Sequence, residues 1–351
     1  MPRITKPDPL GRPSLTSPIR TFVAGWSSPV ARQAHNLKVT GSNPVPAPKV
    51  PKNPPGKKPG GFLRSPLDPG QDRGDALGLA QIISIDDPLD PRIAVFRDVR
   101  ERDLAGRLNS FIAEGEVVLN VLARSPRYRA DALLIADKRI DRLAALIERF
   151  DPNTPVYCAG QAVMDVIAGF PIHRGVLAYG LRAAPLSVDS LLAGCPPRAL
   201  VVVLFGIANH DNIGGVFRNA AAFGASAVLL DPTCCDPLYR KAIRVSVGAA
   251  FSLPFARFDR HEDPIFLLRA HGFESLALSP SGADRLVDLE RPARAAVLLG
   301  TEGPGLPDGI LSRARTVSIP MAGDFDSLNV AVTSGVVLHH LAFAGQTGRR
   351  G

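Results

Sequence analysis

The sequence has little from which to build a metal centre, a disulfide framework or a membrane span. Its 351 residues contain four cysteines, Cys158, Cys195, Cys234 and Cys235. They show neither a C-x-x-C spacing nor histidines close enough to complete a zinc site, so we expect no bound metal and a reducing compartment. The longest apolar run, residues 199–208, is too short to cross a bilayer, and the basic N-terminus lacks the apolar core of a secretory signal. We therefore expect a cytoplasmic protein that contacts no membrane.

Acidic residues are nearly absent from the first fifth of the chain. Residues 1–70 contain 11 of the 41 Lys and Arg but only two of the 33 Asp and Glu, which leaves 30 basic and 31 acidic residues in the remainder. Any affinity of that remainder for RNA must come from local patches. Residues 1–70 also hold 15 of the 33 prolines and the single Trp, a composition typical of an unfolded segment. We assign no fold to residues 1–75.

The origin of this basic segment has two interpretations. Residues 30–49 resemble the conceptual translation of a transfer-RNA gene, above all in the run from Ala34 to Pro44. We therefore expect residues 1–75 to be an extension that the natural protein lacks. The alternative is a translated basic arm that grasps RNA.

Short apolar runs separated by helical spacing predict an α/β chain with two folded domains, at residues 76–185 and 196–348. In the first domain we expect strands at residues 94–96, 132–135 and 156–158, and a helix at residues 141–150. In the second we expect strands at residues 200–205, 227–230, 296–299 and 317–319. Because helical segments separate these last strands, a predominantly parallel sheet is predicted.

A first informative segment, residues 209–220, follows the strand at residues 200–205. Asp211 or Asn212 can cap the helix that begins there, and the apolar residues recur at helical spacing on one side. Arg218 lies on another face. Taken singly, this segment has another interpretation, in which Asn209 only caps a turn and Arg218 is a solvated surface residue.

A second segment, residues 298–306, places three glycines after a buried strand, where backbone amides come within reach of a ligand. It lacks the Lys-Ser/Thr ending of a phosphate loop and the G-x-G-x-x-G spacing of a dinucleotide site. Glu302 would also repel a phosphate. The segment therefore favours a ligand without dense negative charge, or a plain turn.

A third segment, residues 319–332, leads into a helix that extends to about Phe343. Asp326 or Ser327 is the expected cap. Small residues at Ala331 and Gly335 leave room for another helix to approach closely.

These three segments, in this order and each at the carboxyl end of a strand, resemble the signature motifs of the SpoU (TrmH) family of RNA 2′-O-ribose methyltransferases in the SPOUT class. The resemblance is strong over residues 198–345, including residues 246–249. It extends to residues 92–180, where residues 111–115 and 173–178 resemble the family's substrate-binding domain.

The resemblance implies a fold and a cofactor. The fold is α/β, a SPOUT methyltransferase domain with a C-terminal trefoil knot, preceded by a smaller L30e-like α/β domain that binds the RNA substrate. The resemblance also implies a homodimer that uses S-adenosylmethionine. The residues expected to bind this cofactor are Leu299, Gly300, Gly305, Ile319, Met321 and Leu328.

The resemblance also implies catalytic roles at the family's polar positions, which are Asn209, Arg218, Glu302, Ser327 and Asn329. A guanidinium stays protonated, so Arg218 is expected to bind the target phosphate or to stabilise the developing alkoxide rather than to act as a base. Asn209 would orient Arg218, and Glu302 would shape the site. Ser327 and Asn329 would hold the motif loops and the substrate ribose.

Basic residues suggest where RNA binds, although a solvated face explains such runs equally well. The candidates are Arg124, Arg127, Arg129, Arg240, Lys241 and Arg244. The substrate is expected to be ribosomal or transfer RNA. Two other functions are consistent with parts of the sequence: a non-catalytic RNA-binding scaffold of the same fold and, with less support because the dinucleotide motif is missing, a nucleotide-dependent oxidoreductase.

Overall fold

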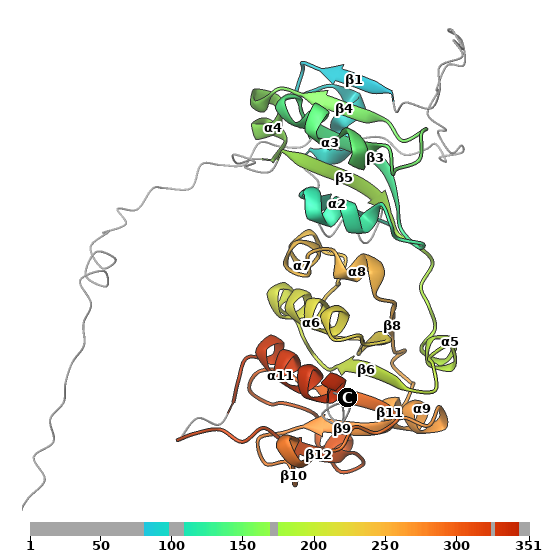
Figure 1. Cartoon of the computed structure of the whole chain (residues 1–351), viewed down its shortest axis with the longest axis vertical. Helices are drawn as coiled ribbons and strands as arrows, with labels where there is room; N and C mark the ends of the chain where they lie inside the picture. Colours follow the sequence, from blue (N-terminus) through green and yellow to red (C-terminus); the bar gives the residue numbers. More distant parts are fainter. Residues whose placement is uncertain (1–80, 98–108, 169–174, 324–326, 344–351) are drawn as a thin grey trace, which may run out of the picture. The chain divides into compact units, whose positions relative to one another are not determined.

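A computed structural model describes residues 81–97, 109–168, 175–323 and 327–343, which form two β-sheets with their helices (Figure 1). The predictions for residues 1–75, for His173 and Arg174, and for Asp326 lie outside these ranges. Within them, no helix is long and apolar enough to span a membrane.

The first sheet has five strands in the order β1-β4-β3-β5-β2. They are β1 (Ile82–Ile85), β2 (Ser110–Glu114), β3 (Arg129–Ala136), β4 (Val156–Ala159) and β5 (Val176–Leu181). The strands β1, β4 and β3 pair in parallel, whereas β5 is antiparallel to both β3 and β2. The helices of this part are α2 (Glu116–Leu122), α3 (Ile140–Ile147) and α4 (Gln161–Ala168), with a 3-10 turn η3 (Asp137–Arg139).

Most sequence predictions for this part are confirmed. Strands occur at residues 132–135 and 156–158, and α3 buries its apolar face. The strand predicted at residues 94–96 is wrong, because these residues belong to a 3-10 helix, η2 (Pro91–Phe96). The Asp90 side chain accepts from the Arg92 amide, and Pro91 occupies the first turn, so local capping outweighs the apolar run.

The second sheet has seven strands in the order β10-β12-β9-β11-β6-β7-β8, and every pairing is parallel. The strands are β6 (Ala199–Leu204), β7 (Ala227–Leu230), β8 (Phe255–Arg257), β9 (Glu274–Leu278), β10 (Asp284–Arg285), β11 (Arg294–Leu299) and β12 (Arg315–Ser318). The predicted parallel sheet is confirmed. Its carboxyl ends all meet at one edge, where the loops gather.

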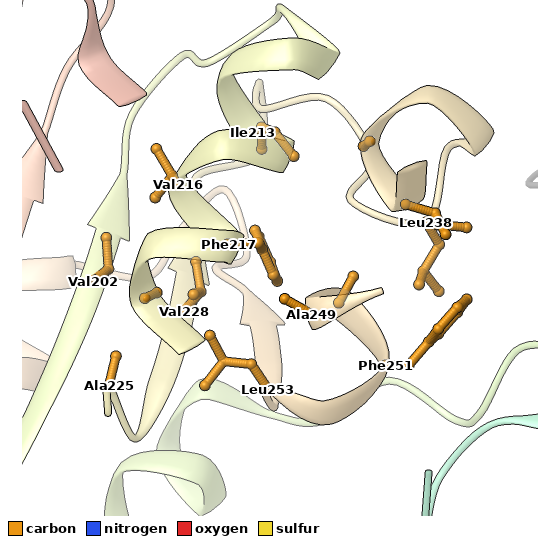
Figure 2. Close-up of a cluster of buried hydrophobic side chains, with 14 of the residues drawn as sticks. Val202, Ile213, Val216, Phe217, Ala225, Val228, Leu238, Ala249, Phe251 and Leu253 are labelled. Atoms are coloured by element: carbon orange, nitrogen blue, oxygen red, sulfur yellow. The ribbon is translucent and has the colours of Figure 1, made fainter. Parts of the chain in front are cut away.

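Helices cover both faces of this sheet. They are α5 (Val188–Ala193), α6 (His210–Ala222), α7 (Arg240–Val245), α8 (Ala249–Ser252), α9 (Pro264–Ala270), α10 (Asp308–Leu311) and α11 (Val330–Phe343), with a 3-10 turn η4 (Leu286–Asp288). Successive residues of β6 alternate between two apolar clusters, so that Val202 belongs to one and Val201 and Val203 to the other. In Figure 2, Val216 and Phe217 of α6 lie among Val202 and Val228 in the first of these clusters.

The same cluster continues into the five-stranded part. Helices α7 and α8 lie between α6 and that part (Figure 1), and Phe251 of α8 contacts Phe111 and Tyr128 at ring-centroid distances of 4.8 and 5.5 Å. Gly248, with φ +81°, lies so close to α2 that an added Cβ would be 3.1 Å from Val121 Cβ. Continuous packing of this kind fixes the two sheets against each other.

Candidate active site

A cavity of about 570 Å³ opens beyond the carboxyl ends of β9, β11 and β12. Its lining comes from the loops that follow these strands and from the first turn of α11. All six residues predicted to bind the cofactor line it: Leu299, Gly300, Gly305, Ile319, Met321 and Leu328. Three segments that are far apart in the sequence therefore meet around one space.

The glycine-rich turn after β11 forms one wall of this cavity. Thr301 and Gly305 pair across the turn, and Gly305 has φ +71°. A Cβ added at Gly300 would lie 2.2 Å from the Gly305 carbonyl carbon, which no side chain tolerates. The turn keeps its shape only because position 300 is glycine.

The charge of the cavity wall is negative. Among the seventeen described residues that line it, Glu302 is the only ionisable side chain, and none is Lys, Arg or His. Most of the other side chains are apolar, and the Thr301 hydroxyl is buried with no hydrogen-bond partner among the described residues. The cavity thus suits a ligand with apolar surface and a positive centre, and disfavours a phosphate.

Three side chains, one from each motif, form a hydrogen-bonded network at the cavity. Asn329 Nδ2 donates to Glu302 Oε1 at 2.6 Å and to Asn212 Oδ1 at 2.9 Å, and Asn212 Nδ2 donates to Glu302 Oε1 at 3.1 Å. Asn212 is 8% exposed. Two amide donors converge on one carboxylate oxygen and fix its direction.

Two asparagines of the first motif have different surroundings. Asn209 is the N-cap of α6, where its Oδ1 accepts from the Asp211 amide at 2.8 Å, and no described contact joins it to Arg218. Asn212, expected only as a possible cap, belongs to the network. The signal for Asn212 was its spacing, because Asn212, Val216 and Ala220 recur every four residues on the buried face.

The expected cap of α11 also needs correction. Asn329, not Ser327, caps this helix, since its Oδ1 accepts from the amides of Ala331 and Val332 at 2.9 and 3.4 Å. One asparagine therefore begins the helix and donates to Glu302. Ser327 lines the cavity and is exposed.

Arg218 lies apart from this network. It is exposed on α6, does not line the cavity, and has no ion pair or hydrogen bond with any described residue. Its helix is held tightly against α11, because a Cβ at Gly215 would be 2.7 Å from Ala331 Cβ and Asn219 Nδ2 donates to the Ala331 carbonyl at 2.7 Å. Within one chain, Arg218 and Glu302 are not brought together.

The residues predicted to bind RNA have different surroundings. Arg240 Nη2 lies 3.1 Å from Glu114 Oε2, and Arg244 Nη1 lies 3.8 Å from it, with the Glu114 side chain only 7% exposed. Lys241 pairs with Asp211, and Arg129 with Asp151. Arg240 and Arg244 thus join α7 to β2, while Arg124 is exposed. Their contacts with RNA stay predictions.

The four cysteines are free thiols, and no group of three His, Cys, Asp or Glu within the described ranges is arranged to hold a metal. Burial raises the pKa of the Cys234 thiol to about 12 and the pKa of the Cys235 thiol to about 11. Neither thiol is an activated nucleophile at ordinary pH.

Comparison with known proteins identifies relatives over most of the described chain. The sequence profile of the SpoU rRNA Methylase family matches residues 199–339. An uncharacterized tRNA/rRNA methyltransferase of Mycobacterium tuberculosis (strain ATCC 25618 / H37Rv) is 36% identical over 272 residues, which cover 74% of this chain and 91% of the relative. A 23S rRNA (guanosine-2′-O-)-methyltransferase of Photobacterium profundum is 29% identical over 237 residues, 66% of this chain and 96% of the relative.

The structure is similar to that of the AdoMet-bound rRNA methyltransferase from Sinorhizobium meliloti. The TM-score is 0.61 at 25% identity, and the match covers 75% of this chain and 97% of the other.

Proposed function

This chain belongs to the SpoU rRNA Methylase family, and from that premise we propose that it transfers the methyl group of S-adenosylmethionine to a ribose 2′-hydroxyl in RNA. Membership makes it an RNA methyltransferase of that family. The cofactor, the acceptor atom and the kind of RNA are the substance of the proposal.

The single observation that carries the proposal is the chemistry of the cavity wall. S-adenosylmethionine combines an apolar adenine with a sulfonium cation, and the cavity offers apolar side chains beside one carboxylate, Glu302, with no basic side chain in the described lining. A nucleotide cofactor would meet repulsion from that same carboxylate. This disfavours the oxidoreductase interpretation.

The residues fit the cofactor in a definite division of roles. The apolar parts of S-adenosylmethionine would pack against Leu299, Ile319, Met321 and Leu328. The backbone around Gly300 would supply polar contacts to the cofactor. When bound, the cofactor supplies an activated methyl group on sulfur. The hydrogen bonds from Asn212 and Asn329 fix the direction of the Glu302 carboxylate, so this side chain needs little reorganisation when the cofactor binds.

The protein must also activate the hydroxyl, which is a weak nucleophile at neutral pH. Arg218 remains protonated and would bind the target phosphate or stabilise the developing alkoxide. Proton removal would then fall to a phosphate oxygen or water. Ser327, exposed at the cavity, would help to hold the ribose.

The proposed homodimer would cover the exposed apolar face of α11. Val332, Val336 and Phe343 are 53%, 41% and 49% exposed. This helix packs against α6, which carries the exposed Arg218. A second copy seated on α11 would bury the apolar face and remove Arg218 from bulk water, which strengthens its charge interactions.

The topology supports two finer features of the fold. Strand β12 lies between β9 and β10, which precede it in the chain, and α11 then packs on α6, as expected if the C-terminal segment is threaded into a trefoil knot. The mixed five-stranded sheet with its short helices supports an L30e-like domain for RNA binding.

Two measurements test the proposal. Calorimetry with the full chain should show S-adenosylmethionine binding, weakened in Glu302→Gln. Nucleoside mass spectrometry of ribosomal and transfer RNA from a deletion strain should show loss of one 2′-O-methylated nucleoside, restored by the wild-type gene. Cofactor binding without transfer to any RNA would favour the scaffold interpretation, and absence of both would reject the proposal.

A further inference from the structure

A second cavity, of about 420 Å³, lies where the five-stranded part meets the edge of the seven-stranded sheet. We call it the junction cavity. Its polar lining consists of Arg127, Tyr128, Arg182, Asp236, Arg257 and Asp259, together with Asn109. It shares no lining residue with the cavity beyond β11.

Two of the three guanidinium groups in this cavity have no carboxylate partner among the described residues. Arg127 Nη2 donates to the Ala184 carbonyl at 2.8 Å. Arg257 donates to the carbonyls of Asp231, Cys234 and Cys235 at 2.6, 2.8 and 3.3 Å. Neutral carbonyl groups orient a guanidinium without cancelling its charge. Both positive charges therefore remain to attract an anion.

The third guanidinium is already neutralised. Arg182 pairs with Asp236 at 2.7 Å, and its Nε donates to the Ser110 carbonyl. Asp259 is the one lining carboxylate without an ion pair among the described residues. The lining thus carries two uncompensated positive charges against one negative charge.

Tyr128 adds a neutral donor. The residue is 5% exposed and its ring packs on Phe111 and Phe251, yet its hydroxyl has no hydrogen-bond partner among the described residues. Burial raises the pKa of the hydroxyl, so it stays protonated and able to donate. The Arg127 guanidinium carbon lies over this ring, 5.6 Å from its centroid, and both residues line the cavity.

We propose that the junction cavity binds a phosphodiester group of the substrate RNA, held by Arg127 and Arg257 with the Tyr128 hydroxyl as a third donor. This inference rests on the proposed function in one respect, that the ligand is RNA. It does not depend on the methyl-transfer reaction. Because Arg127 precedes β3 and Arg257 ends β8, an RNA bound here would touch both sheets at once. This contact would set the register of the RNA without reading its sequence.

The experiment measures RNA binding by fluorescence anisotropy over a range of salt concentrations, using the full chain and a labelled fragment of the RNA found to be methylated. Arg127→Gln should weaken binding about tenfold and reduce the magnitude of the salt slope by about 1, since one charge-assisted contact is lost. Tyr128→Phe should weaken it less and leave the slope unchanged.

Asp259→Asn provides a test in the opposite direction. Asp259 is exposed, so the variant should fold, and removal of its charge should tighten binding severalfold. Arg285→Gln is the matched control, because Arg285 lies on β10, at the edge of the seven-stranded sheet opposite β8. Equal effects of Arg127→Gln and Arg285→Gln, or no tightening in Asp259→Asn, would overturn the proposal.

Two further arms separate the possible causes of failure. Inorganic phosphate should compete with RNA only weakly in the wild type. If instead it displaces RNA as effectively as an oligonucleotide does, the cavity is a site for free phosphate, and the RNA assignment is wrong. Calorimetry with S-adenosylmethionine and single-turnover transfer by the wild type report on the proposed function alone. If the wild type binds the cofactor and transfers the methyl group, but Arg127→Gln binds RNA as tightly as the wild type, only the proposal for the junction cavity is rejected.

Discussion

The two sheets of this protein present their loops in different ways. In the seven-stranded sheet every pairing is parallel, so the loops after β9, β11 and β12 emerge at one edge and enclose the 570 Å³ cavity. In the five-stranded sheet β5 runs against β3 and β2, so its loops are divided between two edges. Parallel pairing gathers loops from distant segments around one cavity, whereas the mixed pairing sends loops to opposite edges of its sheet.

The first prediction separates methyl transfer from cofactor binding in the seven-stranded part. Arg218→Ala should lower methyl transfer about 10³-fold, because it removes the charge that we propose stabilises the developing alkoxide. Affinity for S-adenosylmethionine should stay unchanged, since Arg218 does not line the cavity. Single-turnover transfer and calorimetry measure the two effects, with Arg269→Ala on α9 as the surface control. Retained turnover would remove Arg218 from the mechanism.

The second prediction concerns the attachment between the two parts. Glu114→Gln should lower the free energy of unfolding by about 3 kcal/mol, because Arg240 then loses a buried partner. Glu116→Gln is the matched control, since the Glu116 side chain is 35% exposed and its pair with Arg142 spans 3.4 Å. Glu116→Gln should lower the free energy of unfolding by less than about 1 kcal/mol. Urea denaturation measures both, and similar losses would show that the Glu114 cluster does not hold the parts together.

The third prediction compares two asparagines on one helix turn. Asn212→Ala should reduce transfer about 100-fold, because Glu302 loses one of the two amides that aim it. Asn209→Ala should lower the free energy of unfolding by about 1 kcal/mol through loss of the N-cap and leave most of the transfer activity. The reverse pattern of activity would restore Asn209 as the functional residue.

The fourth and smallest prediction concerns pH and Cys234, whose thiol is 6% exposed. Burial raises its folded pKa to about 12 from an ordinary value of 9.0, so the folded state holds the proton more firmly. Its contribution to stability is therefore present below pH 9 and is lost as pH rises toward 12. Between pH 9 and 10 the free energy of unfolding should fall by about 1 kcal/mol more in the wild type than in Cys234→Ala. Parallel losses in the two proteins would contradict the burial effect.

Periodicity predicted the strands of the seven-stranded sheet well. The runs at residues 200–205, 227–230 and 296–299 are apolar and buried, and each lies in a parallel strand. The run at residues 317–319 is only three residues long and buries only Val317 within β12, yet β12 pairs in parallel with β9 and β10. The run at residues 94–96 is too short for periodicity to decide, and Asp90 with Pro91 begins a 3-10 helix instead. Local capping outweighs hydrophobicity where few residues are involved.

Sequence by itself therefore determined the α/β class, the parallel sheet and the residues of the glycine-rich turn, because these depend on spacing within one segment. Only the tertiary structure decided which asparagine caps α6 and which meets Glu302 and Asn329, since those partners are 90 and 117 residues away from Asn212. It also decided that Arg240 and Arg244 face Glu114 on β2 while Arg127 and Arg257 face the junction cavity. A charge shows its sign in the sequence, but its partner depends on which distant segments the sheets bring together.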